Sequence, residues 1–89
     1  MATVRFTPNL QRHLDVPDCV VRADTVGAAM DQVFALNPRL RSYLLDDQGR
    51  VRRHVTIFID AESIADRQHL SDPLTADAEV YVVQALSGG

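Results

Sequence analysis

The sequence predicts a two-layer α+β domain, in which one helix packs against one face of a small β-sheet. Alternating apolar and polar residues at 2–7 and 51–60 are typical of half-buried strands. Residues 79–86 are rich in Val and Tyr, which favour strands. Residues 26–34 instead repeat apolar side chains with the period of a helix. One amphipathic helix beside several strands can bury its apolar side only by forming a layer against the sheet.

Two strands are predicted before the helix. The first covers residues 2–7, and residues 8–17 are expected to form a loop that Pro17 closes. Residues 18–23 form the second strand, which we expect to pair antiparallel with the first. Cys19 lies in an apolar run of this strand, where a buried structural thiol is the usual arrangement.

The main helix has clear start and stop signals. Asp24 or Thr25 can act as the N-cap, because either side chain can accept an unpaired backbone N–H. Asn37-Pro38 ends the helix, since the residue before proline disfavours the helical region. The apolar face expected to enter the core comprises Val26, Ala29, Met30, Val33 and Phe34.

The second half of the chain is predicted to complete the sheet. Residues 40–44 suggest a short helical segment, and residues 46–50 a tight turn that lacks the ligands of a calcium loop. Residues 51–60 form a central strand, residues 61–77 are irregular, and residues 79–86 form the final strand. This order fits a β-grasp roll: a mixed sheet of four to five strands with one main helix on one face.

Composition excludes several classes of function. The chain has 89 residues, enough for one domain, and a net charge of −3, which argues against nucleic-acid binding. No apolar run is long enough to span a membrane, and the first residues follow a strand-like pattern in place of a leader pattern. We therefore expect a cytoplasmic location. The three histidines lack metal-ligand spacing, and there is no nucleophile elbow or phosphate loop. We therefore expect no metal, no bound cofactor and no active site of its own.

The end of the sequence carries the strongest functional signal. An apolar strand runs almost directly into Ser87-Gly88-Gly89. Glycine adds no side-chain bulk, so such a tail can enter a narrow enzyme channel and deliver the Gly89 carboxylate. All nine basic residues are arginines, so the chain offers no lysine ε-amine to accept its own tail.

A partner-binding surface is also predicted. Phe58 and Tyr81 lie on the strand faces opposite to Ile57 and Val82, so they face a partner if the helix covers the Ile57 side. Burial of these aromatic side chains elsewhere in the fold is an equally good interpretation. Arg53, from the cluster Arg50-Arg52-Arg53, and Leu86, near the tail, complete the predicted set, although such basic clusters are most often simply solvated.

Over its whole length the chain resembles the ubiquitin-like sulfur-carrier family, the MoaD/ThiS grouping. The resemblance rests on the helix start at 24–26, on Asn37-Pro38 followed by Leu40, on residues 53–64, and above all on the apolar final strand that ends in Gly88-Gly89. The cysteine-synthase sulfur carrier is the most similar branch, and the molybdopterin synthase small subunit comes next. Two features depart from the family: Ala76-Asp77 replaces a Gly-Asp turn, and no proline lies near Gln84.

The resemblance implies a single domain over 1–89 with a flexible tail at 87–89. It also implies that an E1-like enzyme uses ATP-Mg to adenylate Gly89. A sulfur donor then converts the adenylate to a thiocarboxylate, which passes its sulfur to an accepting synthase. Gly88 would keep the approach unhindered. Two alternatives stay open: a ubiquitin-like modifier or adaptor that binds through its sheet face, and a small subunit that inserts its tail into a molybdopterin synthase.

Overall fold

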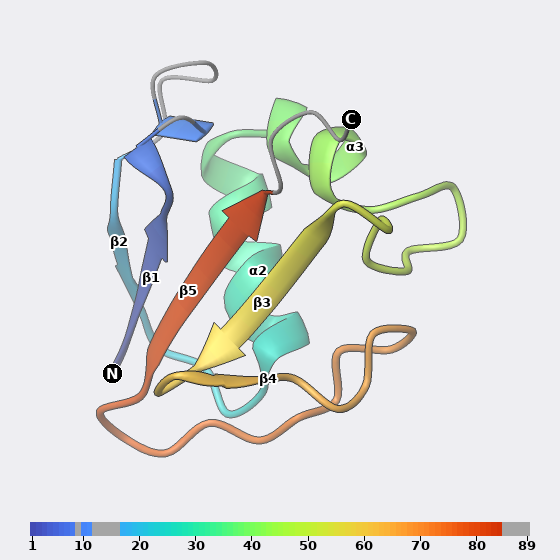
Figure 1. Cartoon of the computed structure of the whole chain (residues 1–89). Coiled ribbons are helices and arrows are strands. Elements are labelled where there is room, and N and C mark those ends of the chain that lie inside the picture. Colours follow the sequence, from blue (N-terminus) through green and yellow to red (C-terminus); the bar gives the residue numbers. More distant parts are fainter. Residues whose placement is uncertain (9, 12–16, 85–89) are drawn as a thin grey trace.

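The chain forms a five-stranded mixed β-sheet with its main helix packed on one face (Figure 1). The computed structural model describes residues 1–8, 10–11 and 17–84. The strands are β1 (Ala2–Phe6), β2 (Cys19–Val21), β3 (Val55–Ile59), β4 (Glu62–Ser63) and β5 (Glu79–Gln84), and the helices are α2 (Val26–Leu36) and α3 (Arg39–Leu44). The predicted α+β class, the mixed sheet and the single main helix are confirmed.

Strand β5 is the central strand of the sheet. The strand order is β2-β1-β5-β3-β4, so β5 lies between β1 and β3. Strands β1 and β5 run parallel, with Val4 opposite Val80, whereas β5 is antiparallel to β3. The predicted antiparallel pairing of β1 with β2 is confirmed, with Val4 opposite Cys19. The strand that leads into the C-terminal tail is therefore held on both sides by neighbouring strands.

Helix α2 forms and stops where the sequence predicts. Thr25 is the N-cap, and its Oγ1 accepts a hydrogen bond from the Ala28 N–H at 3.1 Å. The helix ends at Leu36, before Asn37-Pro38. Its buried face is the predicted one, formed by Val26, Ala29, Met30, Val33 and Phe34. Together with the inward side chains of the strands, these residues form one hydrophobic core.

The region after α2 also follows the prediction. Helix α3 buries Leu40 and Leu44 completely. The predicted turn at 46–50 is closed by Asp46, whose carboxylate accepts the backbone N–H groups of Gln48 and Arg50 at 2.9 and 3.0 Å. These bonds, with the hydrogen bond and charge of the Arg50 side chain, hold the pKa of Asp46 below its usual value.

The loop predicted over residues 8–17 is wrong at residues 8, 10 and 11, whereas Pro17 lies outside regular secondary structure as predicted. Pro8, Leu10 and Gln11 are helical, and the Gln11 N–H donates to the Thr7 carbonyl at 3.0 Å. Proline is compatible with the first turn of a helix because that turn needs no N–H from it. Leu10 is fully buried, so the turn is stabilised by its contribution to the core.

Four further predictions need correction. The strand predicted at 18–23 is limited to Cys19–Val21, and the one predicted from 51 begins at Val55. Cys19 lies on the edge strand and is only half-buried. The region 61–77 contains the short strand β4, which pairs with β3 through a turn at Asp60-Ala61. Both turn residues have positive φ, 48° and 78°, and no glycine marks this hairpin in the sequence.

Candidate functional site

The two aromatic residues predicted to bind a partner lie side by side on the outer face of the sheet. Phe58 of β3 is directly opposite Tyr81 of β5 in the antiparallel register. Their neighbours Ile57 and Val82 point the other way and are completely buried beneath the sheet. Tyr81 is 37% exposed and Phe58 is half-buried. The structure therefore places both aromatic side chains on the outer face of the sheet and not in the core, whereas their partner-binding role stays a prediction.

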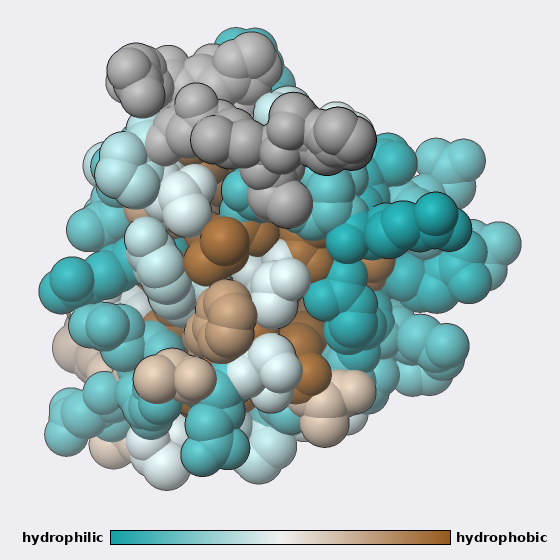
Figure 2. All heavy atoms as spheres, viewed as in Figure 1, coloured by the Kyte–Doolittle hydropathy of each residue, from teal (hydrophilic) through white to brown (hydrophobic). Residues whose placement is uncertain are grey.

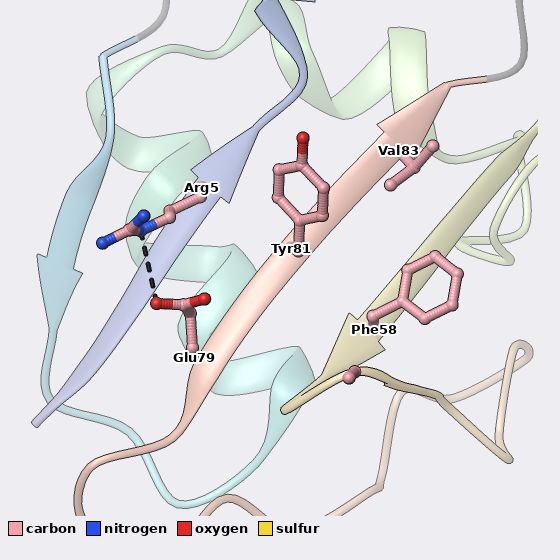
Figure 3. A pocket seen from close by; sticks show the side chains of 6 residues that line it. Arg5, Phe58, Glu79, Tyr81 and Val83 are labelled. Atoms are coloured by element: carbon pink, nitrogen blue, oxygen red, sulfur yellow. Dashed lines mark ion pairs between the residues drawn. The ribbon is translucent and has the colours of Figure 1, made fainter.

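These aromatic side chains line a shallow depression in the outer face. Figure 3 shows Phe58, Tyr81 and Val83 arranged around it, with the Arg5 and Glu79 side chains at one side. The complete lining is Arg5, Phe58, Ala61, Glu79, Tyr81 and Val83. Hydrophobic surface lies in the middle of this face, and hydrophilic surface lies on its left and right in the view of Figure 2. An apolar centre with a polar rim is the usual composition of a protein-binding surface.

An ion pair borders the depression. Arg5 Nε lies 3.4 Å from Glu79 Oε2, and each side chain is 51% exposed. Exposed pairs of this kind stabilise a fold by only about 0–1 kcal/mol, because water screens both charges. Arg5 and Glu79 can therefore separate at low cost in free energy.

The depression lies on the strand that leads into the tail. Of its lining residues, Glu79, Tyr81 and Val83 belong to β5, and the described part of the chain ends one residue later, at Gln84. Leu86, Gly88 and Gly89, three of the predicted site residues, and the predicted flexible segment 87–89 lie outside the described residues. Their roles stay predictions.

Arg53 does not reach the depression. It is exposed in the turn that precedes β3 and is not one of the lining residues. Its two basic neighbours have structural contacts: Arg50 Nε pairs with Asp46 at 2.9 Å, and Arg52 Nε donates to the Ser42 carbonyl at 3.0 Å. The three arginines therefore do not act as one basic surface, because Arg50 and Arg52 are bound within the domain. The partner-binding role of Arg53 stays a prediction.

The sequence reasoning missed four of the six lining residues, namely Arg5, Ala61, Glu79 and Val83. Alternation along each strand shows that Arg5 and Glu79 point outward. It does not show that they meet, because nothing in the local pattern indicates that the first and last strands run side by side. Ala61 enters the site through the unmarked hairpin between β3 and β4.

Within residues 1–8, 10–11 and 17–84, no three His, Cys, Asp or Glu side chains are grouped so that they could hold a metal ion. Partial burial and the nearby Asp18 carboxylate raise the pKa of the Cys19 thiol, which keeps it protonated and weakly nucleophilic at neutral pH. Over the same described residues, no helix has the length and apolar character needed to cross a membrane.

Comparison with known proteins gives matches only at the level of structure. No family model matches the sequence, and no curated protein sequence matches it. Among solved structures, SAMP1 from Haloferax volcanii is 24% identical with a TM-score of 0.79, and the comparison covers 99% of this chain and 98% of that one.

Two CysO structures are similar in the same way. The Amycolatopsis orientalis BexX/CysO complex is 17% identical with a TM-score of 0.83 and complete coverage, 100% of both chains. Mycobacterium tuberculosis CysO is 21% identical with a TM-score of 0.80, over 97% of this chain and 100% of that one. At these identities the likeness establishes the fold. The chain has the β-grasp fold of the ubiquitin-like carrier and modifier proteins, and the resemblance seen in the sequence is confirmed at that level.

Proposed function

We propose that this protein is a sulfur carrier whose Gly89 carboxylate is adenylated and then converted to a thiocarboxylate. The observation that carries the proposal is the position of Gly88-Gly89 in the sequence, separated by only three residues from Gln84, the last residue of the central strand of a β-grasp fold. The fold alone fits many binding roles. A sterically bare dipeptide following its central strand fits a protein whose terminal carboxylate must reach into another protein's active site.

The proposed chemistry needs partner enzymes at each step. The Gly89 carboxylate attacks the α-phosphorus of ATP in an E1-like enzyme, which forms an acyl adenylate and releases pyrophosphate. Sulfide supplied by a donor then attacks the acyl carbon, the bond between that carbon and the AMP oxygen breaks, AMP leaves, and the carbon–sulfur bond of the thiocarboxylate is formed with release of a proton. A free carboxylate is a poor electrophile, so adenylation supplies the leaving group that it lacks. The protein acts as a co-substrate, and we place it in the cytoplasm.

The outer sheet face is proposed to dock the adenylating enzyme. Strand β5 contributes residues to the outer face, and the tail follows its last residue in the sequence. An enzyme bound over Phe58 and Tyr81 therefore lies close to the end of β5. The five residues after Gln84 can span at most about 17 Å when extended. The enzyme's ATP site must therefore lie within that distance of the end of β5. A solved complex of a similar fold, the BexX/CysO complex, supports the general idea that such a domain docks onto a partner.

Deletion of Gly89 tests the proposal. Purified protein is mixed with the E1-like adenylating enzymes of its own organism, and ATP–pyrophosphate exchange is measured. The wild-type chain should support exchange, and the deletion variant should not, although its circular dichroism and thermal unfolding stay unchanged. Gly89→Ala is the matched control, since it keeps the chain length and adds only a methyl group; it should retain part of the activity. Full exchange by the deletion variant contradicts the proposal.

A second candidate function is a ubiquitin-like modifier that becomes attached to other proteins. Two of the similar structures are described as small archaeal modifier protein 1, from H. volcanii and Methanosarcina acetivorans, which favours this candidate. Because the chain has no lysine, one copy cannot accept another at an ε-amine, so any adducts would be to other proteins. Isopeptide-linked adducts in cell extracts would support the modifier. A thiocarboxylate on unconjugated protein would support the carrier.

A further inference from the structure

The end of β5 is tied to helix α3 by a hydrogen bond between side chains far apart in the sequence. Gln84 Nε2 donates to the Tyr43 hydroxyl at 2.9 Å in a partly buried position. Gln84 is the last residue of β5 and the last described residue before the tail. The bond therefore acts at the point where the tail leaves the folded domain.

Tyr43 makes further contacts on its own side of this bond. Its ring packs against the hydrophobic core, and it meets the His54 ring edge-on, with centroids 6.5 Å apart and an interplanar angle of 80°. Helix α3 is anchored in turn by its two buried leucines and by the Arg52 N–H, which donates to the Leu44 carbonyl at 2.9 Å. The hydroxyl thus occupies a position set by α3 and by the turn before β3.

Gln84 is an unusual residue for this position if stability alone matters. Its Oε1 atom is buried and has no hydrogen-bond partner within the described part of the chain. A buried polar atom without a partner is costly, and an apolar side chain of the same shape would avoid that cost. A tyrosine hydroxyl can both donate and accept a hydrogen bond, so the Gln84 amide can bond to Tyr43 through its nitrogen or through its oxygen. In either orientation this bond uses only one of the two polar atoms of the amide.

We propose that the Tyr43–Gln84 pair positions the root of the C-terminal tail for activation. This inference rests on the proposed function and deepens it. The hydrogen bond helps to hold Gln84, the last residue of β5, in the sheet, so the chain leaves the described domain from a fixed point. Without the bond the final residues of β5 would fray, as strand ends do. Each frayed residue would have to be ordered again when the tail enters the adenylating enzyme.

The pair is expected to affect the reaction more than the docking. The bond lies at the end of β5 on the side toward α3, whereas Phe58 and Tyr81 face outward. Losing it should leave the affinity of the sheet face for the enzyme within about twofold and lower kcat for adenylation by about tenfold, which corresponds to re-ordering about one residue. Tyr43 and Gln84 are positioning residues in this proposal, because neither touches the reacting carboxylate.

Two variants and a matched control test the pair. Tyr43→Phe removes only the hydroxyl, and Gln84→Met keeps the length of the side chain while removing its polar atoms. Ser42→Ala is the control: it removes a neighbouring hydroxyl of α3 that donates to the Arg39 carbonyl at 3.3 Å and does not bond to Gln84. Amide hydrogen exchange of Val83 and Gln84 is measured in each free protein. ATP–pyrophosphate exchange is then measured for each protein in the presence of the adenylating enzyme.

The proposal predicts that both pair variants speed amide exchange at the end of β5 by about tenfold and lower kcat, and that the control changes neither. Because the two residues act together, the double variant should be no slower than either single one. If Tyr43→Phe and Gln84→Met show the kcat of Ser42→Ala, the positioning role is wrong although the carrier function stands. If the wild-type protein supports no pyrophosphate exchange, the carrier function itself fails, and with it the role of the pair.

Discussion

Replacing Tyr81 with threonine should weaken docking of the adenylating enzyme by about 20-fold. A tyrosine side chain that becomes fully covered buries about 200 Å². Tyr81 is 37% exposed, so about 75 Å² is left for a partner to cover. At about 25 cal/mol per Å² this area contributes about 2 kcal/mol to binding, which is about 20-fold in Kd.

Threonine is the best replacement because it keeps a strong preference for strands. The loss of the cross-strand contact with Phe58 should cost about 1 kcal/mol of folding free energy, which leaves the domain folded. Isothermal titration calorimetry against the adenylating enzyme, well below the unfolding temperature, measures Kd directly. Leu36→Ala is the matched control, because Leu36 is apolar and 74% exposed but lies on α2, behind the sheet.

The outcome of the pair of variants is decisive for the docking face. The account predicts a large loss for Tyr81→Thr and a Kd within about twofold of wild type for Leu36→Ala, since residues outside an interface contribute little. An unchanged Kd for Tyr81→Thr would refute the assignment of the outer sheet face. An equal loss for both variants would show that general destabilisation, and not a local contact, controls binding.

Two further predictions concern the loops around the sheet. Ala61→Gly should stabilise the domain by about 0.5–1 kcal/mol in urea unfolding, because Ala61 has a φ of 78° that glycine adopts without strain. The control Ala28→Gly, within α2, should instead destabilise the domain by about 1 kcal/mol. Equal effects of the two substitutions would contradict the turn assignment. Asp66→Asn should make the stability of the fold less sensitive to acid. Hydrogen bonds from the Ser71 hydroxyl and the His69 backbone N–H lower the pKa of Asp66 from 3.8 to about 2. The stabilising contribution of the Asp66 carboxylate is therefore present above pH 3.8 and is lost as the pH falls through about 2. Thermal unfolding between pH 5 and about pH 2 should therefore show a shallower loss for the variant than for wild type, and identical profiles would contradict this role of Asp66.

Much of the fold could be predicted because local patterns carry it. The Thr25 cap, the five buried residues of α2 and the stop at Asn37-Pro38 all depend on interactions within a few residues of the chain. The turn at Asp46 is local in the same sense. Each of these elements would have a similar preference in an isolated peptide, so the sequence pattern is sufficient to find it.

The parts that could not be predicted depend on contacts between distant segments. The helical turn containing Leu10 forms because this side chain is buried in a core that the rest of the chain provides. The site combines Arg5 with Glu79, which are 74 positions apart by number and meet because β1 and β5 run parallel. Tyr43 and Gln84 are likewise brought together only by the packing of α3 near the end of the sheet. Periodicity along one strand contains no information about which strand will lie next to it.

Mass spectrometry of the intact protein tests the central claim most directly. The protein is purified from its native host under conditions that preserve acid-labile groups, and the C-terminal peptide is fragmented. The account predicts a fraction of molecules in which one oxygen is replaced by sulfur, with the change located on Gly89. A C-terminal carboxylate that is never modified, together with isopeptide-linked adducts on other proteins, would contradict the sulfur-carrier function and favour the modifier.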